Sequence, residues 1–120
     1  MGKLSIDAMM DAGLDYISAN STELYVCTAE PTDRANAITL TLIAAETPTF
    51  QANSDGIVSG RKKAVDAETD VSITGTGDAT DIVLCSGTLL LYVTTCTLQG
   101  LSSGGTVTVP TWNIEIEDPA

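Results

Sequence analysis

The chain contains no histidine, one tryptophan, one phenylalanine and only five basic residues. Without histidine it lacks the commonest general base and zinc ligand, so neither a Ser-His-Asp nor a Cys-His arrangement can form. No phosphate-binding glycine motif is present. A carboxylate pair for glycoside hydrolysis is the one alternative that residue types leave open. The acids, however, fall mostly on predicted solvent-facing positions. We therefore predict no catalytic residue, no cofactor, no metal site and no enzyme.

Cysteines and long apolar runs are also scarce. The three cysteines, Cys27, Cys85 and Cys96, are an odd number without a C-x-x-C pair. We interpret them as free, buried, small hydrophobic residues of a protein in a reducing compartment, and a disulfide between two of them is the alternative. We expect folding without metal or disulfide. No signal peptide is predicted, and no apolar run is long enough for a membrane span.

What the chain has in excess is negative charge. Sixteen acidic residues against five basic ones give a formal net charge of -11 in 120 residues. Such a surface repels nucleic acids and anionic lipids, so we expect neither nucleic acid nor membrane as a partner. Apolar residues make up 43% of the chain, which is enough to build the core of one domain over residues 1–120.

The first predicted element is a helix over about 4–19, "LSIDAMMDAGLDYISA". Its predicted core residues, spaced three and four apart, are Ile6, Met9, Met10, Leu14 and Ile17. Asp7, Asp11 and Asp15 repeat every four residues on another face, Ser5 is the predicted cap, and Asn20 is the predicted stop. Gly13 is unfavourable in mid-helix, which predicts a close packing contact there.

Short strands are predicted from about 22 to 117. "ELYVC" indicates a strand buried on both faces, and 38–44 a second strand, although the adjoining alanines leave a helix possible. One helical turn is predicted at 33–37, and a long loop at 45–60. Later strands are expected over 61–68, 71–77, 80–85, 89–98, 106–109 and 111–118. The strand at 89–98 is expected to be central, and Trp112 is expected in the core with Ile114 and Ile116. The predicted fold is mainly β, an antiparallel β-sandwich or jelly-roll-like domain with one N-terminal helix.

Three of the five bases are consecutive, Arg61, Lys62 and Lys63. They follow the predicted long loop, beside Asp55 and Gly60. Long loops in compact domains are often functional or contact a partner. These five residues are therefore our candidate interface. The alternative is that the bases pair with acids of the same molecule.

Three segments together resemble a known group of proteins. They are "LSIDAMMDAGLDYISANSTELYVCTAEPT", "DGIVSGRKKAV" and "LLLYVTTCTLQGLSSGGTVTVPTWNIEIEDP". Their order and spacing resemble small structural proteins of tailed bacteriophages, of the capsid decoration or cement type. The resemblance implies a non-enzymatic virion protein on the outer capsid surface, assembled in the bacterial host cytoplasm. Its implied partners are the major capsid protein, copies of itself, or both, as a homo-oligomer or bound to the lattice. The alternatives are a head–tail or tail component, and an adhesion or ligand-binding β-domain that uses loops 45–60 and 99–105.

Overall fold

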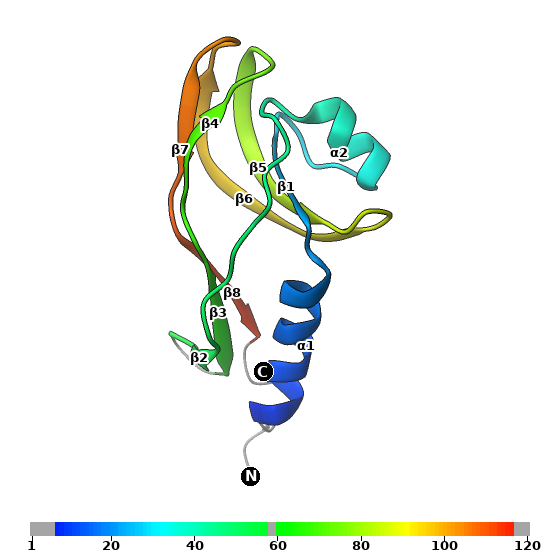
Figure 1. Ribbon diagram of the computed structural model, residues 1–120, viewed down its shortest axis with the longest axis vertical. Coiled ribbons are helices and arrows are strands. Elements are labelled where there is room, and N and C mark those ends of the chain that lie inside the picture. The colour runs from blue at the N-terminus through cyan, green and yellow to red at the C-terminus, as the bar shows by residue number, and fades with distance from the viewer. Residues whose placement is uncertain (1–6, 58–59, 117–120) are drawn as a thin grey trace.

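A computed structural model describes residues 7–57 and 60–116. These residues form an elongated, mainly β molecule of 53 × 26 × 23 Å (Figure 1). Three small antiparallel sheets have the strand orders β1-β5-β6, β2-β3-β8 and β4-β7. The elements are α1 (Asp7–Asn20), β1 (Glu23–Cys27), α2 (Arg34–Leu40), β2 (Ser54–Asp55), β3 (Arg61–Val65), β4 (Glu68–Ser72), β5 (Gly77–Cys85), β6 (Leu90–Leu101), β7 (Thr106–Val109) and β8 (Trp112–Ile116). The predicted mainly β class and N-terminal helix are confirmed, and the described residues show neither a closed barrel nor a clear jelly roll.

Helix α1 lies at one end of the molecule against β3 and β8 (Figure 1). Met10 and Leu14 are buried there, as their spacing predicted, and Ile17 packs against the same core. Met9 was also predicted to be a core residue, and that prediction is wrong, because its side chain is 62% exposed. Adjacent helical residues point about 100° apart, and α1 turns Met10 toward the core and Met9 toward solvent. The predicted helix start, with Ser5 and Ile6, lies outside the described residues.

Gly13 lies where α1 packs against β8. A Cβ atom at this position would lie 3.0 Å from Cδ1 of Ile116. The close contact predicted from the glycine is thus confirmed, and it lets the helix backbone approach the end of the last strand.

This contact makes Gly13 sensitive to side-chain size. Gly13→Ala is expected to change the free energy of unfolding by less than about 1 kcal/mol, since higher helix propensity offsets a small shift of the Ile116 tip. Gly13→Leu is expected to lower it by roughly 1–3 kcal/mol, because overpacking displaces α1. Urea unfolding measures both values. Ala12→Leu, at an exposed position of the same helix, is the control. Equal stability of Gly13→Leu and Ala12→Leu would contradict the contact.

The sheet β1-β5-β6 separates two clusters of buried side chains. Leu24 and Val26 of β1 belong to the larger cluster, which also includes Leu14 of α1. Tyr25 and Cys27 belong to a smaller cluster, which Ala37 of α2 completes on the other face. The prediction that this strand is buried on both faces is therefore confirmed. The alternation matches a sheet packed on both sides, with consecutive side chains entering different clusters.

Helix α2 takes the place of the first part of the strand that was predicted over 38–44. The backbone is helical through Leu40, and Thr41 and Ile43 then make only isolated bridges. Asp33 caps the helix, because its side chain accepts a hydrogen bond of 2.7 Å from the backbone N–H of Asn36. Arg34 then ties α2 to β1 through two hydrogen bonds of 2.8 Å to the Glu23 carboxylate. Capping and alanine content prevail here over the β-branched residues, so the expectation of a single helix is also wrong.

Strand β6 was predicted to be central, but β5 occupies the centre of its sheet. Within the described residues β6 pairs with β5 alone, and β1 pairs with the other side of β5. Five consecutive residues of β5 are buried, Asp81–Cys85, whereas most of β6 is half-buried or exposed. The length and apolar content of β6 suggested a central position. An edge strand can be equally apolar where a helix or loop covers its edge.

The strands on the other side of the main core form one long ribbon. β3 pairs with β8 and β4 pairs with β7, so the predicted strand 61–68 is interrupted at 66–67. The predicted inward face of the last strand is confirmed in part. Ile114 is buried, and Trp112 and Ile116 are half-buried against the main core. The ring of Trp112 stacks on Tyr92 of β6, with centroids 5.9 Å apart.

The three cysteines are free in this structure. Cys27 and Cys85 are buried, as predicted, and Cys96 is only half-buried. Burial raises the pKa of the Cys27 thiol to about 12 and that of Cys85 to about 11. Thiols that remain protonated are poor nucleophiles, so these two residues behave as small apolar side chains.

Candidate interface at the basic cluster

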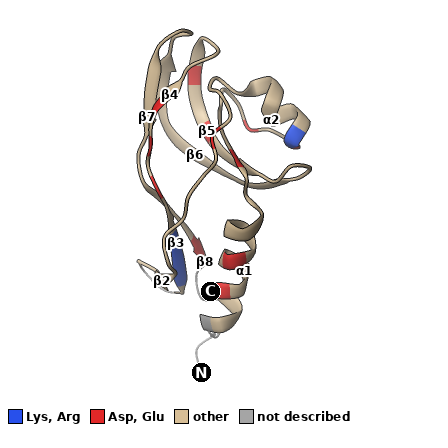
Figure 2. Ribbon diagram, viewed as in Figure 1, with Lys and Arg blue, Asp and Glu red and all other residues tan. Residues whose placement is uncertain are grey.

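The basic cluster lies on β3, at the α1 end of the molecule (Figure 2). Gly60 precedes it with a φ of 73°, a conformation that glycine adopts without steric cost. β2 lies beside it, with Asp55 opposite Arg61 in the register. All five predicted interface residues are therefore brought together. Ser59, in the predicted loop 45–60, lies outside the described residues.

Arg61 joins two acidic residues from different elements. Its Nε lies 2.9 Å from Oδ1 of Asp11 on α1, and its Nη1 lies 2.8 Å from Oδ1 of Asp55. The side chain of Arg61 is 18% exposed, whereas that of Asp55 is 88% exposed. The planar guanidinium with several donors suits such bridging. Arg61 thus links α1 and β2 to its own strand, β3. The Asp55 carboxylate remains largely open to solvent.

Lys63 is the only buried base among the described residues, with 7% exposure. Its Nζ lies 3.3 Å from Oδ1 of Asp15, one helical turn beyond Asp11. The same carboxylate oxygen accepts a hydrogen bond of 3.0 Å from Nδ2 of Asn53. The Asp15 side chain is 63% exposed, so water still reaches the pair at its acidic end.

Matching repeats of charge explain why these two bases meet these two acids. Asp11 and Asp15 are four residues apart on a helix, which corresponds to about 6 Å along its axis. Arg61 and Lys63 are two residues apart on a strand, which corresponds to about 6.8 Å. A helix packed along the strand therefore places both pairs in register. The sequence displayed both repeats, and comparison of their lengths was the signal that could have found Asp11 and Asp15 as partners.

Lys62 points to the other face of β3. It is half-buried and lies opposite Glu115 in the β3–β8 register. Within the part of the chain that the structure describes, no ion pair joins Lys62 to an acid. The alternative of pairing within one molecule therefore accounts for Arg61 and Lys63. Contact of the cluster with a partner stays a prediction, for which Lys62 and Asp55 are the available charges.

No group of three or more metal-binding side chains occurs among residues 7–57 and 60–116. In the same residues, none of the helices combines the length and the apolar character that crossing a membrane requires.

Comparisons with protein-family models, with curated proteins and with solved structures found no match to this chain. Arguments about its function therefore depend on its own residues.

Proposed function

We propose that the protein is a non-enzymatic structural component of a phage virion, a decoration or cement protein on the outer capsid surface. Its partners in this proposal are the major capsid protein and further copies of itself. The observation that carries the proposal is the resemblance of three separate segments to such proteins.

The folded chain adds a spatial argument in support. The first segment supplies α1, the middle one supplies β3, and the last one supplies β8. These three elements contact one another at the α1 end (Figure 1). Segments far apart in the sequence thus build one joined surface, as expected if the pattern reflects a shared role.

The distribution of charge also supports the α1 end as the attachment surface. Copies with a formal net charge of -11 repel each other on a crowded shell. Asp11 and Asp15 are neutralised by Arg61 and Lys63, and Lys62 is left for an external acid. In this proposal a capsid or a neighbouring copy meets the α1 end, where three bases offset part of the negative charge. The finer fold proposal, a β-sandwich of β1-β5-β6 against β4-β7, places the attachment surface outside the sandwich layers.

Removal of the Lys62 charge tests the attachment surface. Lys62→Gln is expected to lower occupancy on purified particles at low salt, because rim charges steer docking, and to leave the melting temperature within about 3 °C of the parent. Thr39→Glu is the matched control, since it also makes the net charge more negative by one unit but lies exposed on α2. Replacing all three bases by alanine is less informative, because it also releases α1.

Two results would contradict the proposal at different levels. Equal occupancy of both variants at every salt concentration would remove Lys62 from the interface. No binding of the parent protein to capsids would reject the decoration role. Binding to tails alone would favour the head–tail or tail alternative, and binding to neither would favour an adhesion or ligand-binding β-domain.

A further inference from the structure

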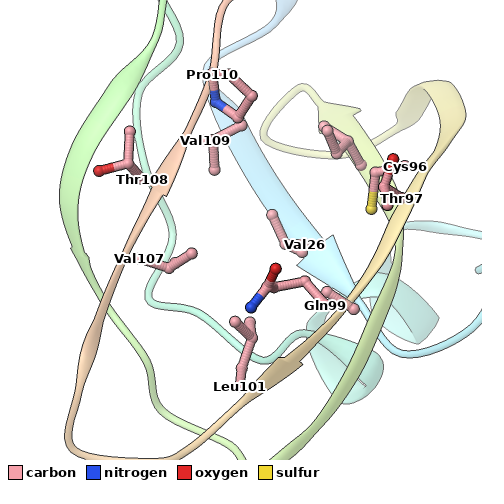
Figure 3. A pocket seen from close by; sticks show the side chains of 11 residues that line it. Val26, Cys96, Thr97, Gln99, Leu101, Val107, Thr108, Val109 and Pro110 are labelled. Carbon is pink, nitrogen blue, oxygen red and sulfur yellow. The ribbon is translucent and has the colours of Figure 1, made fainter.

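An apolar pocket opens between β6 and β7, on the side of the molecule away from α2 (Figure 3). Its volume is about 250 Å³. Val26 of β1 lies at the back, Val107 and Val109 point in from β7, and Leu101 closes one end. The lining therefore matches an aliphatic group better than a polar one.

The two strands that flank the pocket each have one unpaired edge within the described residues. β6 pairs only with β5, and β7 pairs only with β4. Consecutive residues line the pocket on both strands, Cys96 with Thr97 and Thr108 with Val109. Side chains of consecutive strand residues point to opposite faces, so the pocket reaches around the strand edges themselves. Backbone hydrogen-bonding groups and an apolar pocket thus lie beside each other.

These edges lack charged residues, one of the usual protections against pairing with another chain. No charged residue occurs between Asp81 and Glu115, a stretch that contains the whole of β6 and β7. Natural edge strands are commonly blocked by charges, proline or bulges. Here a register shift between Ala79 and Asp81 bends β6, and Pro110 follows β7, but the strands themselves are uncharged. In a chain with sixteen acids, β6 and β7 therefore offer a partner no charged side chain of their own.

Acidic residues lie on the strands that pair with β6 and β7. Asp78 of β5 is exposed and lies opposite Gly100 of β6, and Glu68 of β4 lies opposite Val109 of β7. Burial, together with Glu46 and Asp66, raises the pKa of the Glu68 carboxyl, which indicates crowded negative charge. Arg34 is the only base of the described residues outside β3, and it lies on α2. A partner that brings positive charge to the ends of the groove would be favoured.

We propose that the groove between β6 and β7 binds an extended segment of a partner protein. The segment pairs through its backbone with a free strand edge, inserts an aliphatic side chain into the pocket, and carries basic residues on both sides of an uncharged centre. Extended peptides that add to a sheet edge gain affinity from backbone hydrogen bonds and specificity from such pockets. This inference stands on the pocket and the edges, and it does not depend on the virion role.

Cys96 provides the measurement, because it lines the pocket and is the only cysteine that is not fully buried. The probe is a synthetic peptide of alternating threonine and valine with two lysines at each end. At saturation it is expected to slow alkylation of Cys96 by about tenfold or more, since an added strand covers the thiol. The same peptide with aspartate in place of valine is expected to give no protection, and glutamate in place of lysine should weaken binding.

Two protein variants distinguish binding in the pocket from non-specific attraction of the peptide to the protein. Thr97→Trp places a bulky group at a pocket-lining position and is expected to abolish protection. Leu98→Trp is the control at the next residue, which is 62% exposed and outside the lining. Circular dichroism checks that both variants fold.

Three outcomes would overturn the proposal. The first is no protection at millimolar concentration by the valine peptide or by its leucine and isoleucine forms. The second is equal protection by the aspartate peptide, which would leave only charge attraction. The third is protection that rises with protein concentration without peptide, which would make a second copy the occupant.

Discussion

Replacing Lys63 by glutamate is expected to lower the free energy of unfolding by roughly 3–5 kcal/mol, because it buries an unpaired charge. The Lys63 side chain is 8% exposed, and its only ion-pair partner in the described residues is Asp15. In the variant two carboxylates would face each other between α1 and β3. Urea unfolding measures the change, and loss of α1 should appear as reduced helical signal before global unfolding.

Lys63→Met is the matched control for this prediction. Methionine retains an unbranched apolar stem at a position that shares its face of β3 with buried Val65. Asp15 is 63% exposed and can be solvated once its partner is removed. We therefore expect a change of less than about 1.5 kcal/mol, in line with apolar replacements of buried ion pairs. If methionine and glutamate destabilise equally, the charge on residue 63 does not decide how α1 docks.

Trp112→Ala is expected to lower the free energy of unfolding by about 3 kcal/mol, the lower end of the range for large core aromatics. Trp112 is half-buried, so it loses less than a fully enclosed ring would. It nevertheless packs on the main core and stacks on Tyr92. Thermal unfolding should show a fall of roughly 10–15 °C in melting temperature.

Trp112→Phe tests whether stability depends on the aromatic ring of residue 112 or on its indole N–H. The indole N–H is buried and has no hydrogen-bond partner among the described residues. Phenylalanine keeps a ring for Tyr92 and removes that unsatisfied donor, so we expect a cost below about 1.5 kcal/mol. A variant Trp112→Ala that melts like the parent but fails to bind particles would make Trp112 a recognition residue.

Sequence patterns correctly predicted those features in which the burial of a residue follows from its position along one strand or helix. The alternation of the last strand placed Ile114 in the core, and the predicted close contact at Gly13 was found against Ile116. Local patterns predicted the structure less well where two local preferences compete. At 38–44 alternating β-branched residues indicated a strand, while Asp33 and the alanines stabilise a helix through Leu40.

Long-range arrangement was harder to predict. β6 and β5 have similar apolar content, and only the pairing with β1 makes β5 the central strand. The candidate cluster around Arg61 was found as a set of residues, but its partner Asp11 lies fifty positions away in sequence. The pocket beside Cys96 combines residues from β1, β5, β6 and β7, and no spacing along the chain indicates such a site.

The stacked rings of Tyr92 and Trp112 give the molecule a built-in optical reporter. Trp112 is the only tryptophan, and its contact joins β6 of one sheet to β8 of another. Its fluorescence therefore senses the seam between the two sheets without any added label. A segment that settles beside β7, or a loosening of the ribbon near α1, would alter the emission by changing how closely the two rings lie.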